Sequence, residues 1–239
     1  MHKNSYVLFF AASVTIVCSI LLASGAILLK ERQQENIALD MSKNIIEVAG
    51  LIEQGKDITR QDILGLYDEY IKSKVLDLNG NEVEDRNASD LNPKYDRDLL
   101  PLYYCQKNGE IDSYIIPISG KGLWSTIYGY LALEPDAITV KGITFYKHGE
   151  TPGLGGEIEK DWFKDNFKGK KILSPEGDLI SISVVKGKVS ERVSAEEAYH
   201  YVDGISGSTL TGKGLTQFLK KDLIRYEPFF KQVRKREME

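Results

Sequence analysis

Cysteine is scarce in this chain of 239 residues, and its scarcity excludes a disulfide framework. Cys18 lies inside an apolar run, and a cysteine buried in a membrane cannot reach Cys105 in a soluble domain. The CxxC pairs that commonly bind zinc are absent. The histidines His2, His148 and His200 are scattered and lack the i, i+4 spacing of a zinc-binding helix. We therefore predict that the chain binds no metal.

A basic stripe interleaved with aromatic residues, the usual mark of nucleic-acid binding, is also lacking. The formal net charge is −4, and acidic and basic residues are interspersed along most of the chain. A short basic group appears only near the C-terminus, at Lys231, Arg234, Lys235 and Arg236. We interpret this group as a solvated end, with contact to lipid or a partner subunit as the alternative, and predict no nucleic-acid partner.

Charge is missing altogether from residues 4–29. This apolar run exceeds the ~20 residues that a helix needs to cross a bilayer. We predict a single transmembrane helix at residues 1–30, with the lipid bilayer as its partner. The alternative is a cleaved signal peptide with Lys3 in its charged n-region and a cleavage site among the small residues 23–26, although the apolar region of a signal peptide usually spans only ~7–15 residues. The flanking charges do not decide the orientation.

The pattern of apolar residues then changes along the chain. Helical spacing runs from Ile37 to Ile52 and again from Ile63 to Ile71, the second time after a capping box formed by Thr59 and Asp62. Runs of bulky and β-branched residues predict strands at 114–118, 126–133, 138–146 and 179–185. An apolar stripe predicts a last helix containing Leu215, Phe218, Leu219, Leu223 and Tyr226.

These patterns predict an α+β fold. We expect the membrane anchor at 1–30 to be followed by a helical stalk or cap at 31–105. A domain at 106–239 would then hold a mixed or antiparallel sheet with flanking helices.

Segment 203–209 reads Asp-Gly-Ile-Ser-Gly-Ser-Thr and runs directly into the last helix. Small residues let backbone N–H groups crowd around an anion, and the helix adds the positive end of its macrodipole. The same region matches GxxxxGK at residues 207–213, but Gly214 stands where a P-loop needs Ser or Thr for Mg²⁺. The segment before it also looks helical rather than extended, so we set aside a nucleotide hydrolase.

Three glycine-containing segments together resemble the FMN-binding domain family. Segment 203–209 resembles the family motif Asp-x-x-Ser/Thr-Gly-Ala/Ser-Thr, and Ser208 stands where alanine is commoner. Segment 150–155 resembles its Glu-Thr-Pro-Gly-Leu-Gly signature. Segment 120–133, which contains Leu123 and Trp124, is similar to a stretch typical of family members from sodium-translocating NADH:quinone oxidoreductases.

The resemblance implies one FMN per chain, which a flavin transferase attaches through its phosphate to Thr209. The hydroxyls and N–H groups expected around the phosphate are those of Ser206, Gly207, Ser208 and Thr211. The residues expected at the flavin ring are Leu123, Trp124, Glu150, Thr151, Gly153 and Leu154. Glu150 has an ordinary turn carboxylate as its alternative role. Asp203 either organises the loop or is recognised by the transferase, and Lys213 is a secondary phosphate contact.

The resemblance further implies an electron carrier, one redox subunit of a Na⁺-transporting NADH:quinone reductase. The chain alone would hold no complete active site. Its partners would be other subunits of the complex, especially B, D and E. The FMN domain would lie on the outer, periplasmic side of a bacterial inner membrane. Two alternatives stay open: a subunit of the Rnf-type ferredoxin:NAD electron-transport complex, which the Trp124 region disfavours, and an anchored module that binds a phosphate ligand without redox chemistry.

Overall fold

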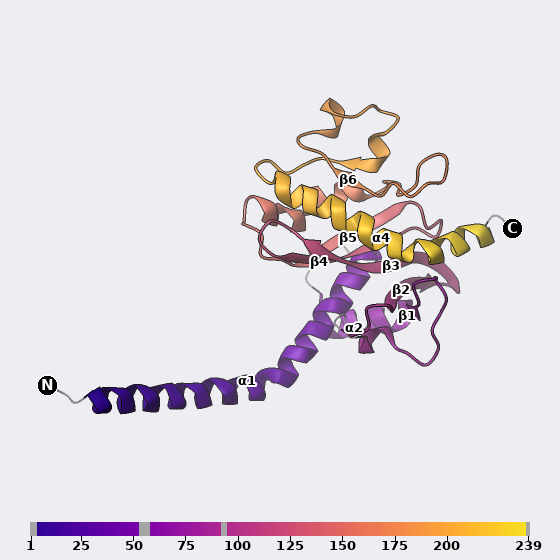
Figure 1. The fold of residues 1–239 in the computed structure, drawn as a ribbon. Helices are drawn as coiled ribbons and strands as arrows, with labels where there is room; N and C mark the ends of the chain where they lie inside the picture. The colour runs from indigo at the N-terminus through magenta and orange to yellow at the C-terminus, as the bar shows by residue number, and fades with distance from the viewer. Residues whose placement is uncertain (1–3, 53–57, 92–94, 238–239) are drawn as a thin grey trace. The chain divides into compact units, whose positions relative to one another are not determined.

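The computed structural model describes residues 4–52, 58–91 and 95–237 (Figure 1). The chain divides into two compact units, Met1–Met41 and Ser42–Glu239. His2 and Lys3, which entered the predictions above, lie outside the described residues. Helix α1 (Asn4–Val48) begins in the first unit and ends in the second, and its first-unit part exposes large apolar side chains such as Phe9, Leu22 and Leu28. The helix is long and apolar enough to cross a membrane, with a mean hydropathy of 2.4 in its apolar window.

The second unit is built on a five-stranded antiparallel sheet in which neighbouring strands follow one another along the chain. Its strands, in spatial order, are β1 (Ile71–Leu76), β2 (Leu100–Lys107), β3 (Glu110–Lys121), β4 (Thr126–Leu133) and β5 (Val140–Lys147). The turn between β2 and β3 consists of Asn108 and Gly109, with φ angles of 53° and 87°. Positive φ at both positions is the geometry that favours Asn-Gly in a two-residue hairpin.

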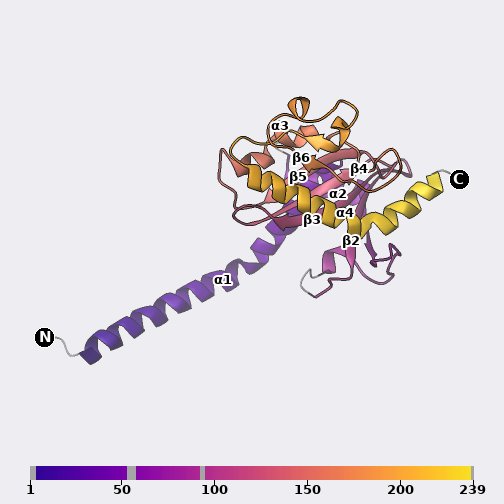
Figure 2. The ribbon, with the colours of Figure 1, turned by 45° about the horizontal axis from the view of Figure 1, so that its top comes forward.

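Helix α4 (Thr209–Glu237) lies along one face of this sheet and packs on β3 (Figures 1 and 2). Side chains of a strand alternate between the two faces, so Ile116 and Ile118 of β3 join the same core as Leu131 and Leu133 of β4. The helix contributes the apolar stripe predicted from the sequence, and all of its members are buried: Leu215, Phe218, Leu219, Leu223 and Tyr226. Burial of this stripe holds the start of α4 against the sheet.

The other elements are short. Helix α2 (Arg60–Tyr70) starts at the predicted cap, where the Thr59 hydroxyl accepts a hydrogen bond from the Asp62 N–H at 3.2 Å. The segment between β5 and α4 is drawn in salmon and orange in Figure 2 and consists of loops and single turns. Its elements are η2 (Gly155–Glu159), α3 (Asp161–Lys164), η3 (Asp165–Phe167), β6 (Ser183–Val184), η4 (Val189–Glu191), η5 (Ala198–His200) and β7 (Tyr201–Val202). Strands β6 and β7 pair in parallel. The single turn η1 (Ala88–Asp90) precedes β2.

The α+β fold and its mainly antiparallel sheet are as predicted. Two details differ. The strand predicted at 179–185 is reduced to Ser183–Val184, because Ser181 adopts a φ of 77° that interrupts an extended run. Strand β1 and all but the last two residues of β2 lie within 31–105, where a helical stalk or cap was expected, and both strands belong to the same sheet as β3. The predicted domain boundaries stay a proposal.

Candidate functional site

The carboxylate of Glu150 joins three segments that lie far apart in the sequence. One oxygen, Oε1, accepts hydrogen bonds from the backbone N–H groups of Trp124 at 2.9 Å and Ser125 at 3.4 Å. The other, Oε2, accepts from the Leu123 N–H at 3.2 Å and from the Thr211 hydroxyl at 2.6 Å. Glu150 therefore ties the loop after β3 and its own loop to the first turn of α4.

The electrostatics of Glu150 follow from these four donors. The residue is only 5% exposed, and burial by itself raises the pKa of a carboxyl group. The Thr211 hydroxyl and the N–H groups of Trp124, Leu123 and Ser125 outweigh burial and lower the pKa of Glu150 below its usual range. Glu150 is therefore a buried carboxylate that dipoles stabilise, and it stays ionised at neutral pH.

Glycines allow the three segments to approach closely. A Cβ on Gly122 would lie 2.6 Å from Glu150 Oε1, and one on Gly155 would lie 2.8 Å from Oε2. A Cβ on Gly214 of α4 would lie 2.3 Å from the carbonyl oxygen of Lys121 at the end of β3. These separations are too short for any side chain. The glycines of the three motifs thus have a packing role at this junction.

Thr209 is the first residue of α4 and is exposed. No described residue accepts a hydrogen bond from the backbone N–H groups of Thr209, Leu210 or Thr211, whereas the Gly212 N–H bonds to the Ser208 carbonyl at 3.0 Å. Free N–H groups at a helix start form a ready anion site. The Ser208 hydroxyl is buried and also has no partner among the described residues. This donor set fits a phosphate esterified at Thr209.

The loop before α4 is fixed by Asp203 and Gly207. Asp203 accepts hydrogen bonds from the Lys188 ammonium and from the Val189 N–H, both at 2.8 Å. Burial raises the pKa of Asp203, but these two donors lower it below its usual range. Gly207 has a φ of 75°, and its Cβ position lies 2.8 Å from a methyl carbon of Leu154. Of the two roles considered for Asp203, the contacts support loop organisation.

Exposed apolar side chains lie on the segments that meet at the start of α4. Leu123, Trp124 and Leu154 are 40%, 70% and 43% exposed, and Leu210, which the sequence analysis did not single out, is 59% exposed. Leu154 approaches Gly207, and the backbone N–H of Trp124 donates a hydrogen bond to Glu150. Large exposed apolar side chains of this kind suit the planar ring system of a flavin, which they can contact through van der Waals interactions.

A cavity of about 420 Å³ opens on one side of Thr209. Its lining includes Val184 and Val185 of the β6 region, Ile205, and the side chains of Lys186 and Lys213. Lys213 thus lies at the same cavity as Thr209, one turn further along α4. Thr151 and Gly153 are exposed in the loop that follows Glu150, and Ser206 is exposed in the loop before Thr209.

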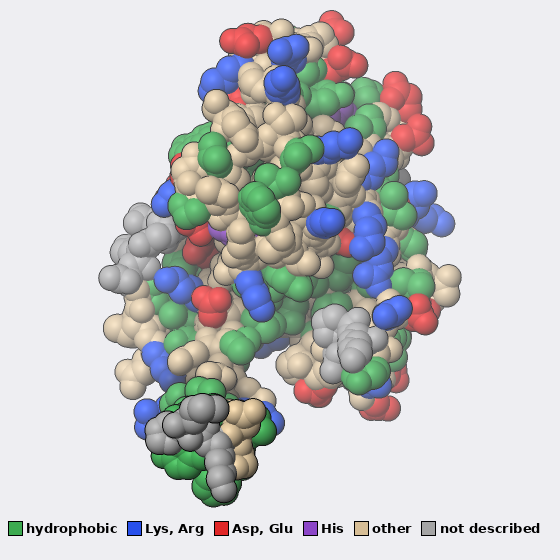
Figure 3. Space-filling model, turned by 60° about the vertical axis from the view of Figure 1, so that its left-hand side comes forward, with side chains coloured by type: hydrophobic (Ala, Val, Ile, Leu, Met, Phe, Trp, Pro, Cys, Tyr) green, Lys and Arg blue, Asp and Glu red, His purple; other side chains and the backbone are tan. Residues whose placement is uncertain are grey.

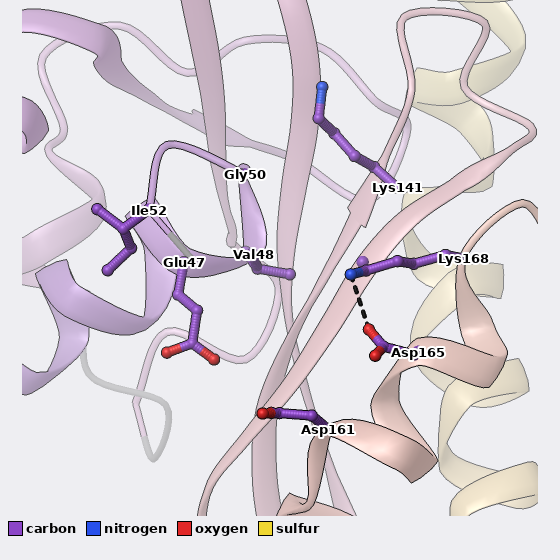
Figure 4. Close-up of a pocket in the computed structure, with 9 residues that line it drawn as sticks. Glu47, Val48, Gly50, Ile52, Lys141, Asp161, Asp165 and Lys168 are labelled. Atoms are coloured by element: carbon purple, nitrogen blue, oxygen red, sulfur yellow. Dashed lines mark ion pairs between the residues drawn. The ribbon is translucent and has the colours of Figure 1, made fainter. Parts of the chain in front are cut away.

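A second cavity, of about 290 Å³, lies away from Thr209 at the end of α1, β5 and α3 (Figure 4). Its charged groups are satisfied by ion pairs. Lys168 pairs with Asp165 at 2.7 Å, and Lys141 pairs with Asp112 at 2.9 Å. Close by, the buried Lys164 ammonium lies 3.1 Å from a carboxylate oxygen of Glu47. Among the described residues, these charged groups of the cavity are paired, in contrast to the free N–H groups beside Thr209.

The FMN-binding domain family matches residues 122–223, a range that contains every segment of this site. The C subunit of the Na⁺-translocating NADH-quinone reductase of Pseudomonas aeruginosa is 35% identical to the chain, over 99% of this chain and 98% of its own length. The chain belongs to this C-subunit family. The same subunit of Vibrio alginolyticus is 35% identical over 84% of this chain and 83% of its own length.

Solved structures of this family share the fold. The C subunit from Parabacteroides distasonis is 33% identical and superposes with a TM-score of 0.73, covering 84% of this chain and 96% of that chain. The NqrC structure from Shewanella oneidensis is 26% identical, with a TM-score of 0.68, covering 82% of this chain and 97% of that chain. The family resemblance drawn from three short motifs is therefore confirmed. The assignment of individual site residues stays a prediction.

Proposed function

We propose that this member of the C-subunit family is an electron carrier with FMN esterified to the hydroxyl oxygen of Thr209. The observation that carries the proposal is the meeting of the three motif segments at the start of α4, where Thr209 is exposed beside N–H groups that have no partner among the described residues. A bound FMN supplies reversible uptake and release of electrons. The protein's contribution is to hold that group in one place.

Attachment forms an Oγ–P bond at Thr209 and breaks a phosphoanhydride bond in a flavin dinucleotide donor, whose nucleoside monophosphate leaves with the hydroxyl proton. The mass of the chain therefore rises by that of FMN minus one water. The neighbouring hydroxyl cannot take the same role. Thr211 is 1% exposed and already donates its proton to Glu150 at 2.6 Å. Thr209 is exposed and unencumbered by any such bond among the described residues. A flavin transferase can therefore reach Thr209 from solvent.

The remaining predicted site residues have distinct roles around Thr209. The free N–H groups of the first turn and the hydroxyls of Ser206 and Ser208 bind phosphate oxygens, and Lys213 adds a positive charge from the next turn. Leu123, Trp124 and Leu154 offer an apolar surface for the ring, while Thr151 and Gly153 line its edge. Glu150 was expected at the flavin ring, but its oxygens already accept four hydrogen bonds within the protein. We assign Glu150 to positioning the ring-binding loop.

The setting of this carrier follows from α1 and from the family. We propose that α1 anchors the chain in a bacterial inner membrane, with the FMN-binding domain on the periplasmic side. The partners are the other subunits of the reductase, especially B, D and E. One chain carries one FMN, and electrons pass through it on the way from NADH to quinone. The apolar window of α1 and the relatives from Na⁺-translocating reductases support this assignment.

The test is to express the chain together with a flavin transferase and to denature the product. A fluorescent band with a mass gain of FMN minus water is expected for the wild type and for Ser190→Ala, which removes an exposed hydroxyl outside the site. Thr209→Ala should carry no covalent flavin. Covalent flavin on Thr209→Ala would show that the attachment site is elsewhere, and its absence from the wild type would refute the electron-carrier function.

A further inference from the structure

Charge is distributed unevenly in this chain. Helix α4 contains eight basic and three acidic residues, a net charge of +5. The other residues of the chain include 23 basic and 32 acidic residues, a net charge of −9. A separation of this size within a protein of net charge −4 creates an extended positive potential along one element.

The lysines of α4 share one face of the helix. Successive members of the series Lys213, Lys220, Lys231 and Lys235 are seven, eleven and four residues apart, which are close to whole numbers of helical turns. Lys221 flanks this series. All five side chains are exposed, and no described residue forms an ion pair with any of them. We call these five residues the cationic face of α4.

The acidic residues of the helix do not offset this face. Asp222 and Glu227 are buried, at 6% and 8% exposure. Glu227 pairs with Arg234, and Asp222 accepts a hydrogen bond from the Ser119 N–H at 2.7 Å. Between residues 209 and 236 no acidic side chain of α4 is therefore exposed. Figure 3 shows Lys and Arg side chains, in blue, gathered on the right-hand side of the molecule.

The cationic face leads to the site around Thr209. Lys213 lines the cavity of about 420 Å³ together with Thr209 and Lys186. From there the lysines continue along the helix for roughly 33 Å, at ~1.5 Å per residue over the span to Lys235. A molecule that binds along this face would therefore also be brought next to Thr209.

We propose that the cationic face of α4 binds a carboxylate-rich surface of another reductase subunit, and so places that subunit beside the flavin. The inference rests on the proposed function, because an electron carrier must approach a redox partner. A lipid surface fits less well. Helices that lie on membranes expose apolar side chains beside their basic residues, whereas the apolar stripe of α4 is buried in the core and Leu210 and Ile224 are its large exposed apolar residues.

The experiment uses the assembled reductase with three charge reversals in this chain, Lys220→Glu, Lys221→Glu and Lys231→Glu. Lys213 is left intact because of its place at the phosphate site. The matched control reverses three exposed lysines outside α4, Lys72, Lys160 and Lys171. Both proteins have the same net charge. The rate at which NADH reduces the covalent FMN of this chain is followed by stopped-flow absorbance over a range of salt concentrations.

The wild type and the control should be reduced fastest at low salt and slow as salt rises. The α4 variant should be slower by roughly tenfold or more at low salt and should lose the salt dependence, because complementary charge acts mainly on association. An unchanged rate and salt dependence in a flavin-loaded variant would overturn the proposal. The proposal would also fail if the reversals had an effect only when the reductase was reconstituted with anionic phospholipid, or if wild-type chains paired with one another through this face.

Two further measurements decide the case in which the Glu variant unfolds and the case in which the wild type carries no covalent FMN. If the Glu variant unfolds, the set Lys220→Gln, Lys221→Gln and Lys231→Gln should show a smaller slowing in the same direction. If the wild type carries no covalent FMN, the proposed function fails, and retention of the chain in the complex is measured against salt instead. Retention by the wild type and loss by the α4 variant would still support the surface. Equal retention of the wild type and the α4 variant would refute the proposed binding surface.

Discussion

Replacing Glu150 by Ala should destabilise the second unit more than most single substitutions. The four donors that face its carboxylate would be left without an acceptor in a buried site. Two of the bonds are short, at 2.9 Å from Trp124 and 2.6 Å from Thr211, and a bond to a charged group contributes about 1.5–3 kcal/mol. Counting mainly these two, we expect the free energy of unfolding to fall by about 3–5 kcal/mol.

Glu150→Gln removes the negative charge of residue 150 while keeping the shape of its side chain. The amide keeps one acceptor oxygen but turns its NH₂ group toward the backbone N–H groups, so we expect a loss of about 1–3 kcal/mol. The assay is urea unfolding of the full chain in detergent at pH 7, followed by tryptophan fluorescence. Glu159→Ala, at an exposed position of the same segment, is the control and should change stability little. A Glu150→Ala loss no larger than that of the control would refute the role given to Glu150.

The pH dependence of this effect has a definite sign. The pKa of Glu150 is lowered in the folded chain, so its contribution is complete above the unfolded value of about 4.3. The contribution is lost as the pH falls through the folded pKa. The stabilities of the wild type and Glu150→Gln should therefore converge in acid and differ most at neutral pH.

Three other substitutions test the surrounding structure. Burial raises the pKa of Asp222 to about 6, so the stabilising contribution of Asp222 is lost as the pH rises through that value. Asp222→Asn should therefore be more stable than the wild type at pH 8, by about 1–3 kcal/mol in urea unfolding. The difference should vanish near pH 4. Gly214→Ala places a Cβ 2.3 Å from the Lys121 carbonyl oxygen and should lower stability by about 1–3 kcal/mol, together with the yield of covalent flavin by mass spectrometry. Lys164→Ala leaves the Glu47 carboxylate, whose side chain is 10% exposed, without the ammonium group 3.1 Å away. The substitution should cost about 3–5 kcal/mol in thermal unfolding, with Lys164→Arg recovering most of the loss.

Local patterns predicted the elements that are long and regular. The stripe from Leu215 to Tyr226 is amphipathic at helical spacing, and α4 buries it. Strands β3, β4 and β5 hold dense runs of apolar and β-branched residues, which is why they could be located. Strand β1 was missed because its first residue, Ile71, continued the helical spacing of α2. The pairing of Ile71 with β2 places this residue in β1 and not in α2, and the sequence does not show that pairing.

The sequence named the segments that meet at the start of α4 but not the contacts between them. The Thr209 loop and the 150–155 segment could be placed in one site through a family resemblance. The hydrogen bond between Thr211 and Glu150 joins residues 61 positions apart, and no spacing rule operates at that range. Glu150 was expected at the cofactor; the structure shows its four hydrogen bonds within the protein, and its contact with the cofactor stays a prediction. Leu210 follows Thr209 directly but was overlooked, because an exposed leucine in a helix is unremarkable on its own.

The long separation between Glu150 and Thr211 also orders events during synthesis. The ribosome makes Glu150 and the loop from Leu123 to Ser125 well before it makes Thr211, so the fourth partner of the carboxylate arrives late. Until α4 docks, Thr209, the proposed attachment residue, has no fixed position relative to the loop that holds Glu150. If FMN is attached at Thr209 as proposed, the growing chain becomes a complete substrate for the transferase only when Thr211 has bonded to this carboxylate.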